Sequence, residues 1–181
     1  MGALQATTLL IRDKCDILIH INVNVEKAVH AYDRIRAFKE TCEEYQVPYD
    51  IDLSVIGNSY QEILNEIRLI FTRIEEKYPN QKKGIFLAND TYANMFLNLI
   101  FQKYRELPSF YEIIGFDNSP IASEAILPIT TVGQQIDIIA QTAMELLVQQ
   151  MEEQKKRSPK PLEKPVHKQI APVLIRRNTT S

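Results

Sequence analysis

Glycine is scarce in this chain, and its placement excludes one large class of function. The 181 residues contain five glycines, where average usage of about 7% would give about 13. These five (Gly2, Gly57, Gly84, Gly115 and Gly133) cannot be arranged into a GxGxxG or GxxxxGK[ST] pattern. A nucleotide-binding loop of either kind is therefore excluded.

Cysteine and histidine are equally sparse, which argues against a metal site. Cys15 and Cys42 do not form a CxxC pair, and His20, His30 and His167 lie far apart. A structural zinc site needs about four closely organised nitrogen or sulfur ligands. We therefore expect neither a bound metal nor a cofactor.

The chain also lacks the features of a membrane or exported protein. No apolar run approaches 18 residues, so no membrane partner is expected. The first ten residues lack the basic and apolar regions of a secretory signal. With two cysteines and no export signal, the sequence favours a cytoplasmic protein.

The charges nearly cancel, since 21 Lys and Arg oppose 23 Asp and Glu. This balance excludes the broad basic field of a free-standing nucleic-acid binder. One local exception is the segment 155–168, with six basic residues, three prolines and one glutamate. We interpret it as a solvated surface connection, with a phosphate-binding patch as the alternative.

Short β-branched runs alternate with longer amphipathic stretches along the chain. Helices are expected over residues 2–12, 30–46, 60–78, 91–105 and 134–156, and strands over residues 16–21, 51–56, 84–88, 111–116 and 170–176. Such alternation is typical of a parallel sheet covered by helices on both faces, because each crossover needs about a dozen residues. The predicted fold class is α/β, a Rossmann-like doubly wound, mainly parallel sheet.

Polar residues follow four of the predicted strands, at the edge where open parallel sheets bind ligands. They are Asn22, then Asn58-Ser59-Tyr60, then Asn89-Asp90, then Asp117-Asn118. This set of amides and single carboxylates can hydrogen-bond a small polar molecule. The sequence therefore predicts a binding site at this edge.

Each of these residues also has a purely structural interpretation. Asp90 is placed to cap the next helix, and Ser59 can cap another. Asn89 and Asp117 are better ligand candidates, because each is followed by a second polar residue that could do the capping. Arg34 falls in the first turn of its helix, where a cation is poorly matched to the helix dipole. Such an arginine is either solvated or needed for a bidentate grip on a ligand.

Catalysis has little support in the sequence. No G-x-S-x-G or HExxH pattern is present, and His20 lies inside an apolar run as a core histidine would. A carboxylate pair of Asp90 and Asp117, serving a small hydrolase or transferase, remains an alternative. We expect a binding protein with no catalytic residues.

Ordered motifs carry a resemblance to a known family. Residues 85–93 (IFLANDTYA), 113–118 (IIGFDN), 127–134 (LPITTVGQ) and 173–180 (VLIRRNTT) resemble the signature of lactose-repressor and galactose-repressor type transcription regulators. Residues 2–11 resemble the helix that opens their C-terminal effector-binding subdomain, and Arg34-Ile35-Arg36-Ala37-Phe38 resembles their R-x-x-G-F element. The resemblance covers nearly the whole chain.

The resemblance implies a type I periplasmic-binding-protein-like effector domain, working as a homodimer. By motif position it implies that the effector is held by Arg34, Asn89, Asp117 and Gln134, with Tyr60 or Ser59 near a ring-stacking position. A sugar is favoured over a purine as the effector.

The resemblance also implies a division of the chain. Residues 1–133 and 169–181 correspond to the C-terminal effector-binding subdomain. Residues 134–168 correspond to a helix and basic connection that would pack on an N-terminal subdomain. DNA would then be bound only through an N-terminal headpiece outside this sequence. A solute receptor of a sugar transport system on the same fold is the alternative.

Overall fold

One sheet organises the molecule. The computed structural model describes residues 1–23, 31–54, 59–155 and 166–181, and all statements below concern these residues. The strands are β1 (Ile17–Val23), β2 (Tyr49–Ser54), β3 (Lys83–Leu87), β4 (Tyr111–Asp117), β5 (Thr130–Gly133) and β6 (Val173–Ile175). They lie in the order β2-β1-β3-β4-β5-β6, and every pairing is parallel except that of β5 with β6.

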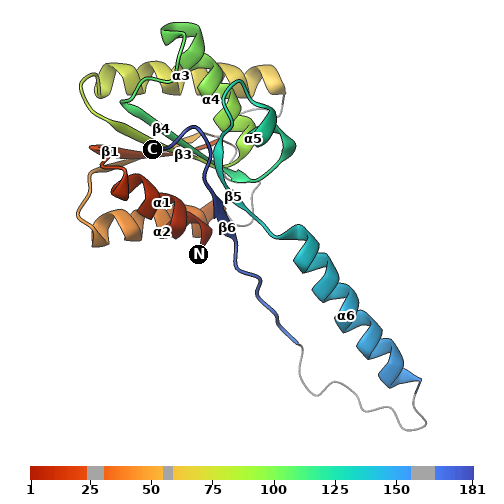
Figure 1. Ribbon diagram of the computed structural model, residues 1–181. Coiled ribbons are helices and arrows are strands. Elements are labelled where there is room, and N and C mark those ends of the chain that lie inside the picture. Colours follow the sequence, from red (N-terminus) through yellow and green to blue (C-terminus); the bar gives the residue numbers. More distant parts are fainter. Residues whose placement is uncertain (24–30, 55–58, 156–165) are drawn as a thin grey trace.

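Helices cover both faces of this sheet, which confirms the predicted doubly wound, mainly parallel fold. The helices are α1 (Gly2–Arg12), α2 (Ala31–Glu44), α3 (Tyr60–Lys77), α4 (Asp90–Tyr104), α5 (Pro120–Glu124) and α6 (Ile136–Gln154). Figure 1 shows α1 and α2 below the sheet and α3 and α4 above it. In the described part of the chain, no helix is long and apolar enough to cross a membrane.

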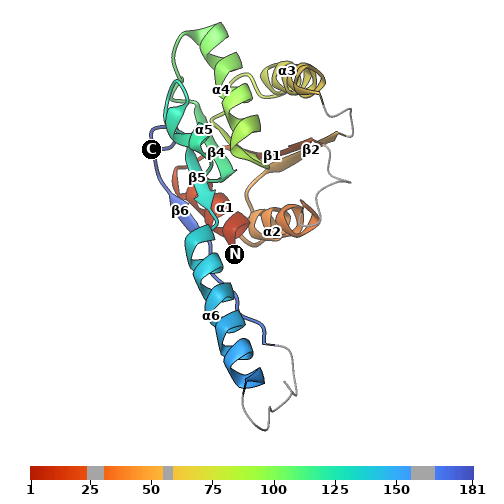
Figure 2. The ribbon, with the colours of Figure 1, turned by 90° about the vertical axis from the view of Figure 1, so that its right-hand side faces the viewer.

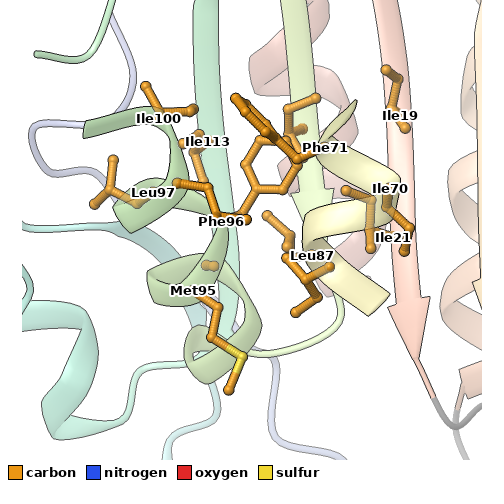
Figure 3. Packing of buried hydrophobic residues seen from close by; sticks show 14 of the residues in the cluster. Ile19, Ile21, Ile70, Phe71, Leu87, Met95, Phe96, Leu97, Ile100 and Ile113 are labelled. Carbon is orange, nitrogen blue, oxygen red and sulfur yellow. The ribbon is translucent and has the colours of Figure 1, made fainter. Parts of the chain in front are cut away.

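The upper layer is held by the apolar stripes of α3 and α4. Helix α3 starts at a capping box between Ser59 and Glu62, and its buried stripe contains Ile67, Ile70, Phe71 and Ile74. Phe71 meets Phe96 of α4 edge to face, with ring centroids 5.4 Å apart. Figure 3 shows both rings packed over strand residues such as Ile21, Leu87 and Ile113.

The lower layer contains the one buried histidine of the described chain. Phe38 of α2 packs here with Leu10, Leu18 and Phe86. His20 is fully buried beside the Phe38 and Phe86 rings, and its Nδ1 lies 3.0 Å from the Phe86 carbonyl oxygen. The expectation of a core histidine is confirmed, although its Nε2 has no partner among the described residues.

Several predicted boundaries and faces were wrong. Strand β2 begins at Tyr49, earlier than expected, and Asn22 lies within β1 rather than after it. For the helix expected over 30–46, the spacing predicts one buried face of Ile35, Phe38, Cys42 and Tyr45. Phe38 and Cys42 are buried as predicted, and so is Thr41, whereas Tyr45 is exposed and lies one residue beyond the end of α2. Both β5 and the short α5 were missed, because four or five residues are too few to show a period.

Helix α6 leaves the body of the molecule. None of its 19 residues is buried, and Figures 1 and 2 both show it projecting away from the sheet. The returning chain is attached near the start of this helix, where Gln135 Nε2 donates to the Ala171 carbonyl oxygen at 2.7 Å. Most of the basic connection predicted at 155–168 lies outside the described residues, which resume at 166.

Candidate functional site

The strand order creates a crevice between β1 and β3. The helix after β1 covers one face of the sheet, whereas the helix after β3 covers the other (Figure 1). Such a reversal leaves a depression beyond the carboxyl ends of the two strands, where ligands bind in open α/β sheets. Arg34 enters this edge from α2, Asn89 follows β3, Asp117 ends β4 and Gln134 follows β5.

Arg34 is fixed at this edge by two contacts from neighbouring strands. Its Nη1 donates to the carbonyl oxygen of Ala88 at 2.6 Å, and its guanidinium carbon lies 3.8 Å from the centroid of the Phe116 ring. Burial lowers the pKa of Arg34, and the Asp117 carboxylate opposes that lowering. The side chain is therefore a half-buried cation with nitrogen donors left over for a ligand.

Asp117 and Gln134 form a second fixed pair. Gln134 Nε2 donates to Asp117 Oδ1 at 3.1 Å. Asp117 is the last residue of β4 and pairs in register with Gly133, so β5 sets its distance from Gln134. Both side chains are exposed, which leaves carboxylate and amide oxygens free to accept hydrogen bonds from ligand hydroxyls.

Two cavities meet at the segment Gln134–Gln135, which lines both. One of about 400 Å³ is bounded by Arg34, Phe116 and the start of α1. The other, of about 490 Å³, is bounded by Asp117, Asn118 and the β6 residues Val173 and Ile175. Each is large enough for a small polar molecule. The structure thus brings Arg34, Asp117 and Gln134 together, as the family resemblance implies.

The interpretation of Asn89 and Asp90 has to be corrected. Asn89, not Asp90, caps α4, because its Oδ1 accepts from the Tyr92 amide at 2.9 Å. Asp90 is buried, and its two oxygens accept from the Thr131 hydroxyl at 2.5 Å and the Ser119 amide at 2.7 Å. Asn89 stays at the predicted edge, half-buried, with its amide donors not used by the cap.

The carboxylate-pair alternative loses support from the same contacts. Burial raises the pKa of Asp90, whereas the hydrogen bonds from Thr131 and Ser119 lower it. Both of its oxygens are occupied within the protein, so no oxygen faces a substrate. The residues described also contain no group of three His, Cys, Asp or Glu side chains that could hold a metal ion.

Ser59 and Tyr60 lie apart from the other candidates. The Ser59 hydroxyl is engaged with Glu62 in the capping box of α3, which confirms its structural interpretation. Tyr60 is 62% exposed at the start of the same helix. Neither residue lines the two cavities above, and Asn58 lies outside the described residues. A ligand role for Ser59 or Tyr60 stays a prediction.

Three residues of this region were not singled out in the sequence as site residues. Phe116 supports Arg34, Thr131 contacts Asp90, and the Arg177 guanidinium donates to Asn118 Oδ1 at 2.7 Å. All three stand inside the motifs that carry the family resemblance. Position in a motif was therefore the available signal, because nothing in composition or periodicity distinguishes them.

Comparison with known proteins identifies the family. A model described as "Periplasmic binding protein-like domain" matches residues 9–180. The chain belongs to this family. Its resemblance to regulators of the lactose-repressor type is likewise confirmed, because the relatives of this periplasmic binding protein-like chain include several repressors.

Three of these relatives illustrate the match. The ribose operon repressor of Halalkalibacterium halodurans is 27% identical over 151 residues, covering 83% of this chain and 43% of the repressor. The HTH-type transcriptional repressor PurR of Vibrio parahaemolyticus is 25% identical over 178 residues, covering 98% and 50%. The structure of the transcriptional regulator CelR–cellobiose complex superposes with a TM-score of 0.75 at 21% identity, covering 98% of this chain and 51% of the other. This periplasmic binding protein-like chain thus spans about half the length of its relatives.

Proposed function

We propose that this chain is the effector-binding part of a ligand-responsive transcription regulator and that its effector is a small sugar. The observation that carries the proposal is the placement of Arg34. Held by the Ala88 carbonyl and the Phe116 ring, it shares one edge of the sheet with the Asp117–Gln134 pair. The curated relatives named above are repressors, which favours a regulator over a solute receptor.

A sugar suits this set of groups for a chemical reason. Adjacent sugar hydroxyls both donate and accept, so they match a planar cation on one side and carboxylate and amide oxygens on the other. A wrong hydroxyl pattern would leave one of these groups unpaired, which costs affinity. Two relatives point the same way, since one is a ribose operon repressor and another is a regulator in complex with cellobiose. A purine is the alternative effector.

Binding without catalysis belongs to the same proposal. The buried carboxylate of Asp90 is occupied by internal hydrogen bonds, and we assign the exposed carboxylate of Asp117 to holding the effector. As part of a repressor, the chain would act inside the cell, as a homodimer, and contact DNA only through a separate headpiece.

Helix α6 and the connection after it would serve a second lobe of the regulator. Residues 134–168 then pack on an N-terminal subdomain, whereas residues 1–133 and 169–181 form the effector-binding subdomain. Support comes from the exposure of apolar side chains along α6, among them Met144, Leu147 and Met151. Effector held between two lobes would favour one closure of the lobes and so change how a dimer presents its DNA-binding units.

Calorimetric titration of the full-length gene product tests the proposed site. The ligands are D-ribose, cellobiose, lactose, hypoxanthine and guanine. We expect one sugar to bind. Arg34→Ala should weaken the affinity for that sugar by about 10- to 100-fold, since a hydrogen bond to a charged group is lost. Arg36→Ala is the matched control, because Arg36 is exposed and, among the described residues, pairs with Asp33 on the surface. No binding of any sugar, or equal affinities of Arg34→Ala and the unaltered protein, would overturn the proposal.

A further inference from the structure

The turn that carries Asp117 has an unusual backbone. Asp117 and Asn118 have φ angles of 99° and 53°, and neither is glycine. Two consecutive residues in the left-handed region are costly and persist only where the surrounding structure holds them. The direction of the Asp117 side chain therefore depends on whatever holds this turn.

Asp90 holds the turn from inside the protein. Its Oδ2 accepts from the backbone amide of Ser119 at 2.7 Å, and its Oδ1 accepts from the Thr131 hydroxyl at 2.5 Å. The Thr131 oxygen in turn accepts from the Asn118 amide at 3.3 Å. The Asp90 carboxylate is buried and reaches the two residues that follow Asp117, directly or through Thr131.

Arg177 holds the same turn from the C-terminal segment. Its Nη2 donates to Asn118 Oδ1 at 2.7 Å, and its Nη1 donates to the Ile129 carbonyl oxygen at 2.9 Å. The segment itself is fixed at Thr179, which is buried and whose hydroxyl donates to the Ile113 carbonyl oxygen at 2.7 Å. Arg177 thus ties the turn after β4 to the chain entering β5, from a segment about 60 residues away in sequence.

We propose that Asp90 and Arg177 are positioning residues for the effector site. They hold the Asp117–Asn118 turn in its left-handed form and so fix the Asp117 carboxylate beside Gln134. Neither lines the two cavities, so both act through Asp117. The consequence for affinity rests on the proposed function, whereas the consequence for the geometry of the turn does not.

Arg177→Met tests this inference, with Arg176→Met as the matched control. Arg176 is the neighbouring arginine, half exposed and 3.9 Å from Asp13, away from the turn. In ¹⁵N–¹H spectra we expect Arg177→Met to shift the backbone amides of residues 117–119 and the side-chain amide of Gln134. Arg176→Met should leave these signals in place. In the full-length gene product, Arg177→Met should also weaken the affinity for D-ribose, or for whichever sugar of the panel binds, by about tenfold.

A second background separates positioning from general stabilisation. Asn118→Gly removes the side-chain acceptor of Arg177 and relieves the left-handed strain, because glycine adopts positive φ freely. Arg177→Met should therefore cause no further shift of the Gln134 side-chain amide in that background. If Arg177 only stabilised the protein, Arg177→Met would lower the melting temperature by the same amount in the unaltered and the Asn118→Gly backgrounds. It would then not move the Gln134 side-chain signal in either background. Should Arg177→Met not fold, Arg177→Lys keeps the cation and removes the two-pronged donation.

Two outcomes would overturn the inference. One is an Arg177→Met spectrum in which residues 117–119 and Gln134 coincide with the unaltered protein. The other is a shift of equal size in Arg176→Met. If no sugar binds the unaltered protein, the proposed function fails, and the spectra still decide whether Arg177 positions the turn.

Discussion

The carboxylate of Asp90 lies directly against Gly115, in the space that a side chain at position 115 would fill. A Cβ built on Gly115 would come within 2.3 Å of Asp90 Oδ1 and 3.2 Å of Asp90 Cα. Gly115 stands in β4, and the buried carboxylate crosses over it to reach Thr131 of β5. The glycine is therefore needed for close approach between β4 and the start of α4.

Gly115→Ala should accordingly destabilise the protein. The added methyl group must displace Asp90 from its hydrogen bonds, and overpacking of this kind costs about 1–3 kcal/mol of unfolding free energy. Urea denaturation followed by circular dichroism measures the change. Gly133→Ala is the milder comparison, because the nearest atoms to its Cβ are Ile175 Cδ1 at 3.0 Å and Asn118 Cβ at 3.1 Å, both farther away than Asp90 Oδ1 is from position 115. Equal stabilities of Gly115→Ala and the unaltered protein would contradict the close approach described here.

Arg34→Ala should reduce stability even without ligand. The substitution removes a charged hydrogen bond to the Ala88 carbonyl and a cation–π contact with Phe116, together worth about 1–3 kcal/mol. Arg36→Ala, two residues along the same helix, removes only an exposed pair with Asp33 and should change the unfolding free energy by less than about 0.5 kcal/mol. Chemical denaturation of both variants at neutral pH checks this, and a larger loss in Arg36→Ala would show the assignment to be wrong.

The sequence predicted the fold better than its details, for a physical reason. Long amphipathic segments such as α3 and continuous apolar strands such as β3 carry a strong period, so their existence and order were predicted correctly. The strand β5 and the helix α5 are too short to carry such a period. They were not predicted, because their formation depends on contacts with residues distant in the chain. Tyr45 is exposed although it follows Thr41 at helical spacing, because α2 already ends at Glu44, and the local pattern did not predict this end.

The site shows the same division between local and tertiary information. Position after a strand correctly placed Asp117 at this edge, and position in the first turn of a helix placed Arg34 there, whereas Gln134 came only from the family resemblance because β5 was not predicted. It failed to distinguish Asn89 from Asp90, because either can cap a helix and the choice is made by Ser119 and Thr131, about 30 and 40 residues away. The support of Arg34 by the Phe116 ring was equally invisible, since the two residues are joined only by the order of the strands.

The buried histidine should make stability depend on pH. Burial, together with the nearby charge of Arg34, lowers the pKa of His20 from 6.5 to about 4, although the contact with the Phe86 carbonyl opposes this. Between these two values the unfolded chain binds the proton and the folded chain does not. Stability contributed by neutral His20 is therefore complete above pH 6.5, is lost as the pH falls toward 4, and amounts to about 3 kcal/mol.

Replacement of this histidine checks the prediction. His20→Phe should lose less stability than the unaltered protein between pH 7 and pH 4.5, as measured by urea unfolding at both values. His167→Asn is the control, because His167 is exposed and its removal should leave the pH dependence unchanged. Identical pH dependence in His20→Phe and the unaltered protein would show that His20 does not titrate in this way.

A mostly buried carboxylate of α3 that faces α4 gives a further prediction. Glu75 accepts hydrogen bonds from Lys103, Tyr104 and Tyr111. Burial raises the pKa of Glu75, but these three donors outweigh it and the net shift is downward. Tyr111→Phe removes one donor to a buried charge and should cost about 1–3 kcal/mol in denaturant unfolding. Tyr45→Phe, at an exposed tyrosine, should cost nothing measurable, and the same result for Tyr111→Phe would contradict the role of its hydroxyl.

Helix α6 should contribute little to the stability of residues 1–181. Because none of its side chains is buried, its amides should exchange with solvent about a hundredfold faster than those of α4, as measured by hydrogen exchange and NMR. Leu147→Ala in α6 should change the unfolding free energy by less than about 0.5 kcal/mol. Leu97→Ala in α4, where the side chain is fully buried, should cost about 2–5 kcal/mol.

The same pair of variants tests the proposed division of the chain. In the full-length gene product, α6 would be covered by the second lobe, so Leu147→Ala should become costly there while the effect of Leu97→Ala stays the same. A large loss from Leu147→Ala already in residues 1–181 would mean that α6 packs within this chain. A negligible loss in the full-length product would instead show that no second lobe covers Leu147.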